Sequence, residues 1–335
     1  MEYPSLKNPT AGAFRFNTDS SQLEIYDGNQ WTGVLATSPG LQTGGTRGVY
    51  SAGYGMPSGE VNSIEYIQVN TTGNAQDFGD LTQARNMSSA VSSRTRWVCW
   101  NGEASGGKNT IDYVTFTSTG NALDFGDGIN TKWAGTGMSS STRGVNASGR
   151  NPGEINSISY LTIASTGNAL DFGDLVYTAS EPGGCSSPTR GIIAGGGVPN
   201  YSNNINYITI STTGNAADFG DMIGTTRMSP SGCSNSVRGL LMGGGLSPNE
   251  TYTNEIQYLE IATLGNTLDF GDLTAADFRG CALASSTRGV YHTGGTPNKI
   301  LEYVQLMTTG NAVDFGDAVI YGRSGAAQSN GHGGL

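Results

Sequence analysis

The sequence predicts an all-β protein whose main part is a six-bladed β-propeller, each blade being one copy of a sequence repeat. Two observations support this fold. A nine-residue string that ends in Asp-Phe-Gly-Asp occurs six times, and each copy follows the same order of apolar and glycine-rich segments. The asparagine of the string recurs at intervals of 47, 47, 47, 51 and 45 residues, at Asn74, Asn121, Asn168, Asn215, Asn266 and Asn311.

Each repeat contains four strand candidates, the number found in one propeller blade. Shortly before the motif lies an apolar segment such as Ile64–Val69, which is apolar on both faces, as expected for a strand that is covered on both sides. Further upstream, an arginine begins a segment that usually runs into paired glycines, and a small-residue segment such as Met87–Ser93 precedes it. The arginines are Arg47, Arg96, Arg143, Arg190, Arg238 and Arg288.

The positions at which the chain enters and leaves the repeats favour a closed ring over an open β-solenoid, whose rungs are normally shorter. The repeats begin at the strand Thr46-Arg47-Gly48 and end with Arg323–Asn330, which is similar to the small-residue strand before each other arginine. We therefore expect the last segment to complete the first blade, which would leave no free sheet edge.

A short module precedes the repeats. Residues 11–34 alternate in polarity and predict three strands joined by turns at Thr18–Ser21 and Asp27–Asn29. Because a module of this length cannot form a hydrophobic core by itself, we expect it to pack on another protein or on a second copy of itself. The predicted organisation is an attachment module over 1–35, a linker over 36–43 and the propeller over 44–335, with anchor residues Phe14, Phe16, Tyr26 and Trp31.

The repeat order resembles a degenerate kelch repeat, with Asp-Phe-Gly-Asp at the place of the usual kelch tryptophan. Over residues 44–320, the tandem Thr-Gly-Asn-Ala-x-Asp-Phe-Gly-Asp units also resemble repeats in virion structural proteins of bacteriophages that infect marine cyanobacteria. Residues 11–34 are similar to a short module of phage tail-fibre proteins.

The resemblance implies a virion protein, assembled in the host cytoplasm and displayed as a tail fibre, knob or decoration. Its expected partners are other virion proteins, through residues 1–35, and a host surface polysaccharide or a further virion protein. We also expect it to form a homo-oligomer in the particle.

The repeated charged side chains are expected to be structural. We expect each repeated arginine to hydrogen-bond to a carboxylate or a main-chain carbonyl of its own or the next blade. We expect the repeated aspartates to act in turns and to form a hydrogen bond or ion pair with the repeated arginine of the same or the adjacent blade. A calcium loop is disfavoured, because two acids separated by Phe-Gly are too sparse for one. These aspartates are Asp77, Asp124, Asp171, Asp218, Asp269 and Asp314.

The candidate binding face carries the loops that differ between repeats. The loops after the paired glycines and after Asp-Phe-Gly-Asp emerge on one face of the predicted blades, and aromatic residues lie in them. Exposed aromatics among Asn, Ser and Gly suit sugar stacking or protein contact, while ordinary loop packing is the other interpretation. The residues are Tyr54, Trp133, Tyr177, Tyr201 and Tyr252.

Composition argues against several other functions. The net charge of −10, from 17 Lys+Arg and 27 Asp+Glu, provides no basic stripe for nucleic acid. No apolar run is long enough for membrane insertion. The two histidines form no catalytic constellation, so we expect no enzyme activity, catalytic residues, metal or cofactor. The four cysteines are expected to be buried thiols.

Two other functions remain open. One is a cellular kelch-like interaction module, against which the N-terminal module counts. The other is a carbohydrate-active enzyme with a propeller fold, against which the lack of a unique acid and base pair counts.

Overall fold

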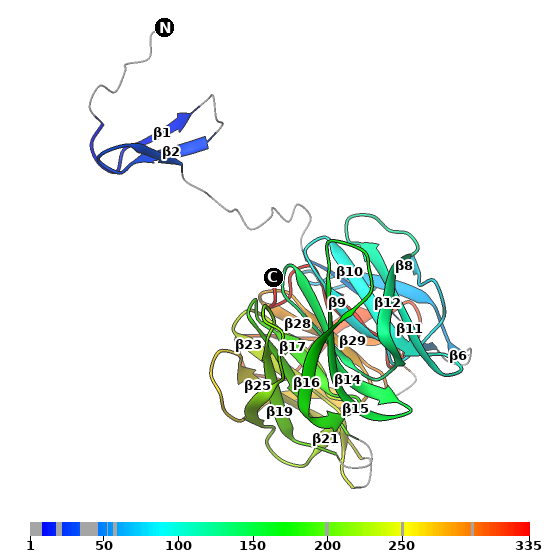
Figure 1. Ribbon diagram of the computed structural model, residues 1–335. Coiled ribbons are helices and arrows are strands. Elements are labelled where there is room, and N and C mark those ends of the chain that lie inside the picture. Colours follow the sequence, from blue (N-terminus) through cyan, green and yellow to red (C-terminus); the bar gives the residue numbers. More distant parts are fainter. Residues whose placement is uncertain are drawn as a thin grey trace. The chain divides into compact units, whose positions relative to one another are not determined.

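The computed structural model describes residues 9–17, 22–33, 46–51, 53–55, 59–197, 201–248, 251–295 and 298–335 (Figure 1). The chain divides into two compact units, Met1–Thr43 and Gly44–Leu335. Within the described ranges there is no helix, and every pairing between named strands is antiparallel, which confirms the predicted all-β class. The predicted linker 36–43 and the turn Thr18–Ser21 lie outside the described residues.

The N-terminal unit contains a three-stranded meander of β1 (Phe14–Asn17), β2 (Gln22–Tyr26) and β3 (Trp31–Gly33). Asp27 forms the second turn, because its carboxylate accepts hydrogen bonds from the amides of Asn29 and Gln30 at 2.7 and 2.8 Å. Alternation along the strands gives the sheet two different faces.

One face of the meander carries aromatic and charged side chains. Arg15 lies over the Trp31 ring at 4.4 Å, and Tyr26 packs on Trp31 with ring centroids 5.4 Å apart. The other face carries Phe14 and Phe16, which are 61% and 62% exposed. The unit therefore leaves two large apolar side chains uncovered by its own described residues.

The larger unit is built from small antiparallel sheets, whose strands we number first to fourth. Sheet 1 comprises β31 (Ala327–Ser329), β4 (Arg47–Ser51), β7 (Ser63–Gln68) and β8 (Gln76–Asp80). Sheet 2 comprises β9 (Ser89–Ser92), β10 (Arg96–Glu103), β11 (Gly107–Thr115) and β12 (Leu123–Lys132). Sheet 3 comprises β13 (Thr136–Ser139), β14 (Arg143–Asn151), β15 (Gly153–Thr162) and β16 (Leu170–Ala179).

The remaining sheets follow the same plan. Sheet 4 comprises β17 (Gly183–Ser186), β18 (Arg190–Ala194), β19 (Asn204–Thr209) and β20 (Ala217–Asp221). Sheet 5 comprises β22 (Ser231–Ser234), β23 (Arg238–Met242), β25 (Thr251–Glu260) and β26 (Leu268–Asp277), extended by β24 (Gly245–Leu246) and β21 (Arg227–Met228). Sheet 6 comprises β27 (Cys281–Ala284), β28 (Arg288–His292), β29 (Ile300–Gln305) and β30 (Val313–Asp317), and a separate hairpin pairs β5 (Tyr54–Gly55) with β6 (Gly59–Glu60).

The core lies between the sheets. Six clusters of described apolar residues each combine side chains from two successive sheets, and one of them combines sheets 6 and 1. Phe78 of sheet 1, for example, shares a cluster with Trp97 of sheet 2. The third strands are apolar on both sides, as Ile64 and Ile67 show with 0% and 3% exposure. Each repeat therefore stabilises the unit by burying apolar surface against the sheets on either side of it.

First strands of successive sheets lie against one another. Contacts run from β9 through β13, β17, β22 and β27 to β31, and β31 contacts β9. Glycines allow this close approach: a Cβ atom on Gly137 would lie 2.1 Å from the carbonyl oxygen of Ala90. The small-residue composition of these strands follows from that crowding.

The repeated motif joins the fourth strand of one sheet to the residues that immediately precede the fourth strand of the next sheet. In the first copy, the carbonyls of Phe78 and Asp80 accept hydrogen bonds from the amides of Gly120 and Ala122, both at 2.7 Å. The amide of Asp80 in turn donates to Asn121 Oδ1 at 3.1 Å. We call this set of three hydrogen bonds the clasp. The bond from Asp to Asn recurs in Asp127–Asn168, Asp174–Asn215, Asp221–Asn266, Asp272–Asn311 and Asp317–Asn74.

Candidate binding site

The repeated arginines occupy one environment in all six sheets. Each guanidinium lies 4.2–4.7 Å from the ring centroid of a third-strand tyrosine of its own sheet. Each also donates to a main-chain carbonyl of the next sheet, the kind of partner expected from the sequence. The pairs are Arg47–Phe116, Arg96–Ile163, Arg143–Ile210, Arg190–Ile261, Arg238–Leu306 and Arg288–Val69.

The repeated aspartates do not pair with these arginines in the described part of the chain. The first aspartate of each motif is exposed, while the phenylalanine that follows it is buried, as Asp77 and Phe78 illustrate. The guanidinium is directed to the tyrosine ring and the next sheet, and so lies away from the carboxylate. The expected ion pair between Asp and Arg is therefore wrong, and the motif acts through main-chain groups and its asparagine.

The aromatic residues of the variable loops mostly have partners within the protein. Tyr177 donates to the carbonyl oxygens of Gly195 and Asn204 at 3.2 and 3.1 Å, and burial raises its pKa to about 12. Tyr54 lies under the guanidinium of Arg323 at 4.8 Å.

The other three aromatics differ in exposure. Tyr252 stacks on Phe278 with ring centroids 4.0 Å apart and is 42% exposed. Trp133 and Tyr201 are half-buried. Parts of these loops, residues 56–58, 198–200 and 249–250, lie outside the described residues. Among the five, Tyr252 is the most exposed residue.

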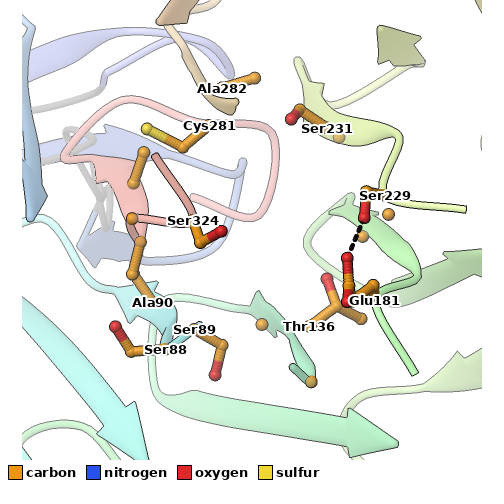
Figure 2. A pocket seen from close by; sticks show the side chains of 18 of the residues that line it. Ser88, Ser89, Ala90, Thr136, Glu181, Ser229, Ser231, Cys281, Ala282 and Ser324 are labelled. Atoms are coloured by element: carbon orange, nitrogen blue, oxygen red, sulfur yellow. Dashed lines mark hydrogen bonds between the residues drawn. The ribbon is translucent and has the colours of Figure 1, made fainter. Parts of the chain in front are cut away.

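A central pocket, which the sequence did not reveal, lies where the first strands of the six sheets begin. Its volume is about 130 Å³, and one short segment from each of the six repeats lines it (Figure 2). Most of the lining residues are small, many of them glycine or alanine, and others such as Ser88, Thr136 and Ser231 carry a hydroxyl group. The pocket is therefore assembled by the whole unit and belongs to no single repeat.

Six residues at equivalent positions of the repeats surround the pocket, and we call them the rim residues. All six have a left-handed backbone, with φ between +50° and +60°. Main-chain hydrogen bonds of 2.7 or 2.8 Å join neighbouring rim residues at five steps. Between the fourth and fifth, the Ser231 hydroxyl donates to the carbonyl of Gly280 at 2.8 Å. The rim residues are Met87, Ala134, Glu181, Ser229, Arg279 and Ser324.

Two rim residues carry opposite charges and meet at the pocket. Arg279 donates to both carboxylate oxygens of Glu181, from Nε at 3.0 Å and from Nη2 at 2.9 Å. The hydroxyl of Ser229 donates to the same carboxylate (Figure 2). The Glu181 side chain is 7% exposed and that of Arg279 is 24% exposed. The carboxylate is thus held in one orientation by three donors.

A second, partial ring of hydrogen bonds lies at the opposite ends of the first strands. Serine hydroxyls donate to the main-chain carbonyl of the preceding sheet, as in Ser186 to Ser139 at 3.0 Å and Ser234 to Ser186 at 2.8 Å. The same pattern crosses from sheet 2 to sheet 1 and on to sheet 6, through Ser92 to Ser329 and Ser329 to Ala284.

The C-terminal residues cover this second ring. His332 Nε2 lies 3.3 Å from both Ser139 Oγ and the carbonyl of Ser92, at the step between sheets 3 and 2. The amide of Gly333 donates to the carbonyl of Ser234 at 2.8 Å. Burial lowers the pKa of His332 to about 4, so the ring is neutral near pH 7. Because this end is covered, the central pocket is a cup that opens on the rim side.

Cys281 lines the pocket, and burial raises the pKa of its thiol to about 12, so the thiol stays protonated. All four cysteines are buried, free thiols. In the described ranges, no group of three or more His, Cys, Asp or Glu side chains could hold a metal ion. Nor does a helix that could span a membrane occur there.

Sequence reasoning missed Glu181, Arg279 and His332 because it searched for residues that recur. A usable signal was present: the residue nine positions before each repeated arginine from Arg96 to Arg288 is a rim residue, and these five positions read Met, Ala, Glu, Ser and Arg. A charge that occurs in only one repeat marks a place where the repeats are not equivalent. In comparisons with known proteins, no family model matched the chain and no curated protein was similar in sequence.

Proposed function

We propose that the larger unit is a closed six-bladed β-propeller. Successive first strands contact one another as far as β31 and β9, and the six core clusters include one between sheets 6 and 1. The clasp also recurs between Asp317 and Asn74, which lie in the last and first repeats. These three relationships support a ring in which every sheet has two neighbours.

We further propose that the protein is a non-enzymatic structural component of a phage virion. In this proposal the N-terminal unit attaches it to the particle, and the propeller is displayed as a fibre tip, knob or decoration. The observation that carries the attachment role is the apolar face of the meander, where Phe14 and Phe16 are uncovered. An isolated three-stranded sheet with such a face is stabilised when another chain covers it. The expected partner is another virion protein or a second copy of the chain.

The propeller would present its variable loops and central pocket to the surroundings. Variable loops on a rigid scaffold are a common site of recognition. The protein surface is acidic overall, with a net charge of −10, which favours partners other than nucleic acid. A host surface glycan or a further virion protein is the proposed partner at this end.

Deletion of residues 1–35 tests the attachment role. The truncated protein is expected to remain folded and soluble but to be absent from assembled particles. Phe14→Ser with Phe16→Ser should weaken incorporation in the same direction, while Arg15→Ser serves as a control on the other face of the sheet. Normal incorporation of the truncated protein would refute the attachment role.

A further inference from the structure

We propose that the central pocket binds the terminal monosaccharide of a neutral glycan, and that Glu181 and Arg279 hold its hydroxyl groups. This inference rests on the proposed function, because it assigns a site and a ligand class to the displayed end of the propeller. It places recognition in the pocket and not on the loop aromatics, most of which already have partners within the protein.

The six repeats act as internal controls for the role of Glu181 and Arg279. All six rim residues adopt the same left-handed backbone conformation, yet Ala134 and Ser324 do so without a charge. The main-chain hydrogen bonds of the ring likewise need no particular side chain. Neither the acid nor the base is therefore required to form the rim. Their occurrence in one repeat each makes an otherwise repetitive pocket asymmetric, which is what a ligand of defined orientation requires.

The size and shape of the pocket limit the ligand to one small ring. Its volume of about 130 Å³ is well below the roughly 300–1,000 Å³ of pockets that enclose drug-sized ligands. The C-terminal residues, through His332 and Gly333, cover the far ends of the first strands. A glycan therefore cannot pass through the centre. It enters from the rim side by its end.

The charges favour a neutral ligand with many hydroxyl groups. Glu181 and Arg279 neutralise each other, so an anion or a cation would have to separate them. A sugar hydroxyl both donates and accepts, so it can bridge the carboxylate edge and neighbouring groups such as Ser231 or Thr136 without breaking the pair. Pro182 and Pro230 follow two of the rim residues and line the same pocket. They supply apolar surface for the C–H groups of a sugar ring.

The test measures binding of neutral monosaccharides to the full-length protein by titration calorimetry and ligand-observed NMR. The panel is glucose, galactose, mannose, rhamnose and N-acetylglucosamine, with glucuronic acid as the charged comparison. We expect at least one neutral sugar to bind with a millimolar Kd, and Glu181→Gln to weaken it at least tenfold. Asp124→Asn removes an exposed acid from an outer strand and should leave the Kd unchanged.

A second variant keeps the test decisive if Glu181→Gln unfolds. Ser324→Phe places a large side chain at a rim position whose equivalents already hold Met87 and Arg279, and it should abolish binding by filling the mouth. The inference is overturned if no neutral sugar binds the wild-type protein. It is equally overturned if binding survives both substitutions, or if Tyr252→Ala removes binding while they do not.

These outcomes are separate from those of the attachment test. A protein that enters particles but binds no neutral sugar refutes the inference alone. A protein that binds sugar in the pocket while its truncated form still enters particles refutes the attachment role alone.

Discussion

The main-chain amide of Asp317 donates a hydrogen bond of 3.1 Å to the side-chain oxygen of Asn74, although 243 residues separate them in the sequence. At the other five clasps the same bond joins residues only 39–45 positions apart. The same hydrogen-bond geometry therefore joins consecutive repeats and also joins the last repeat to the first. The other two bonds of the clasp are present as well: the amides of Gly73 and Ala75 donate to the carbonyls of Phe315 and Asp317, both at 2.8 Å.

The clasp between the last and first repeats should contribute as much to the free energy of unfolding as a clasp between two consecutive repeats. Asn74→Ala and Asn168→Ala each remove one hydrogen bond to a main-chain amide, and each should lower the free energy of unfolding by about 1 kcal/mol. Urea denaturation of the two variants measures this directly. If Asn168→Ala were destabilising and Asn74→Ala neutral, sheets 6 and 1 would not be joined in solution.

Replacing a repeated arginine should lower the free energy of unfolding much more than replacing a repeated aspartate. Arg190→Ala removes the cation over Tyr207 and leaves the carbonyl of Ile261 without its donor, at an expected cost of about 1–3 kcal/mol in the free energy of unfolding. Asp171→Ala changes an exposed side chain and should stay within about 0.5 kcal/mol of wild type. Urea denaturation compares the two. Equal losses would show that the aspartate carries an interaction after all.

Lys132 should make stability rise with pH above neutrality. Burial lowers the pKa of its amine to about 7, and no hydrogen-bond partner for it occurs among the described residues. Between pH 7 and the ordinary lysine value of 10.5, the unfolded chain holds more protons than the folded one. The free energy of unfolding therefore increases with pH in that window.

Lys132→Met isolates this contribution. The substitution should stabilise the protein most at pH 7 and below, with a gain that shrinks towards pH 9. Thermal and urea unfolding at pH 6, 7, 8 and 9 provide the measurement. The buried cysteines have raised pKa values and make stability fall as the pH rises. Because wild type and variant share these cysteines, their contribution cancels in the difference between the two proteins. A gain that does not depend on pH would contradict the lowered pKa.

His332 should make the protein sensitive to acid. Its pKa is lowered by burial to about 4 from an ordinary value of 6.5, so the unfolded chain takes up a proton that the folded chain does not. Stability is therefore fully present above pH 6.5 and decreases as the pH falls towards 4. His332→Gln should flatten the fall of stability between pH 7 and 5, measured by urea unfolding. His292, whose pKa is also lowered to about 4, remains as the second contributor and serves as the comparison through His292→Gln.

Much of the fold could be predicted because the repeats reveal it. Apolar residues on both faces of Ile64–Val69 correctly predicted a covered strand, and the segment Arg323–Asn330 includes β31, which does pair beside β4. The repeated arginines were correctly selected because a side chain that serves the same contact six times has to recur. The clasp uses the main chain of the motif's second aspartate, such as Asp80, and not the exposed first aspartate, such as Asp77, that we had singled out from the sequence.

The sequence by itself determined the repeat, its strands and the order in which they pair, because these depend on local alternation and on contacts between equivalent residues. Only the tertiary structure decided where unlike residues meet. Glu181 and Arg279 are 98 positions apart and come together because six first strands begin around one pocket. His332 reaches Ser92 because the chain returns to its starting sheet. Such contacts are made once, between repeats that differ, so no periodic pattern in the sequence records them.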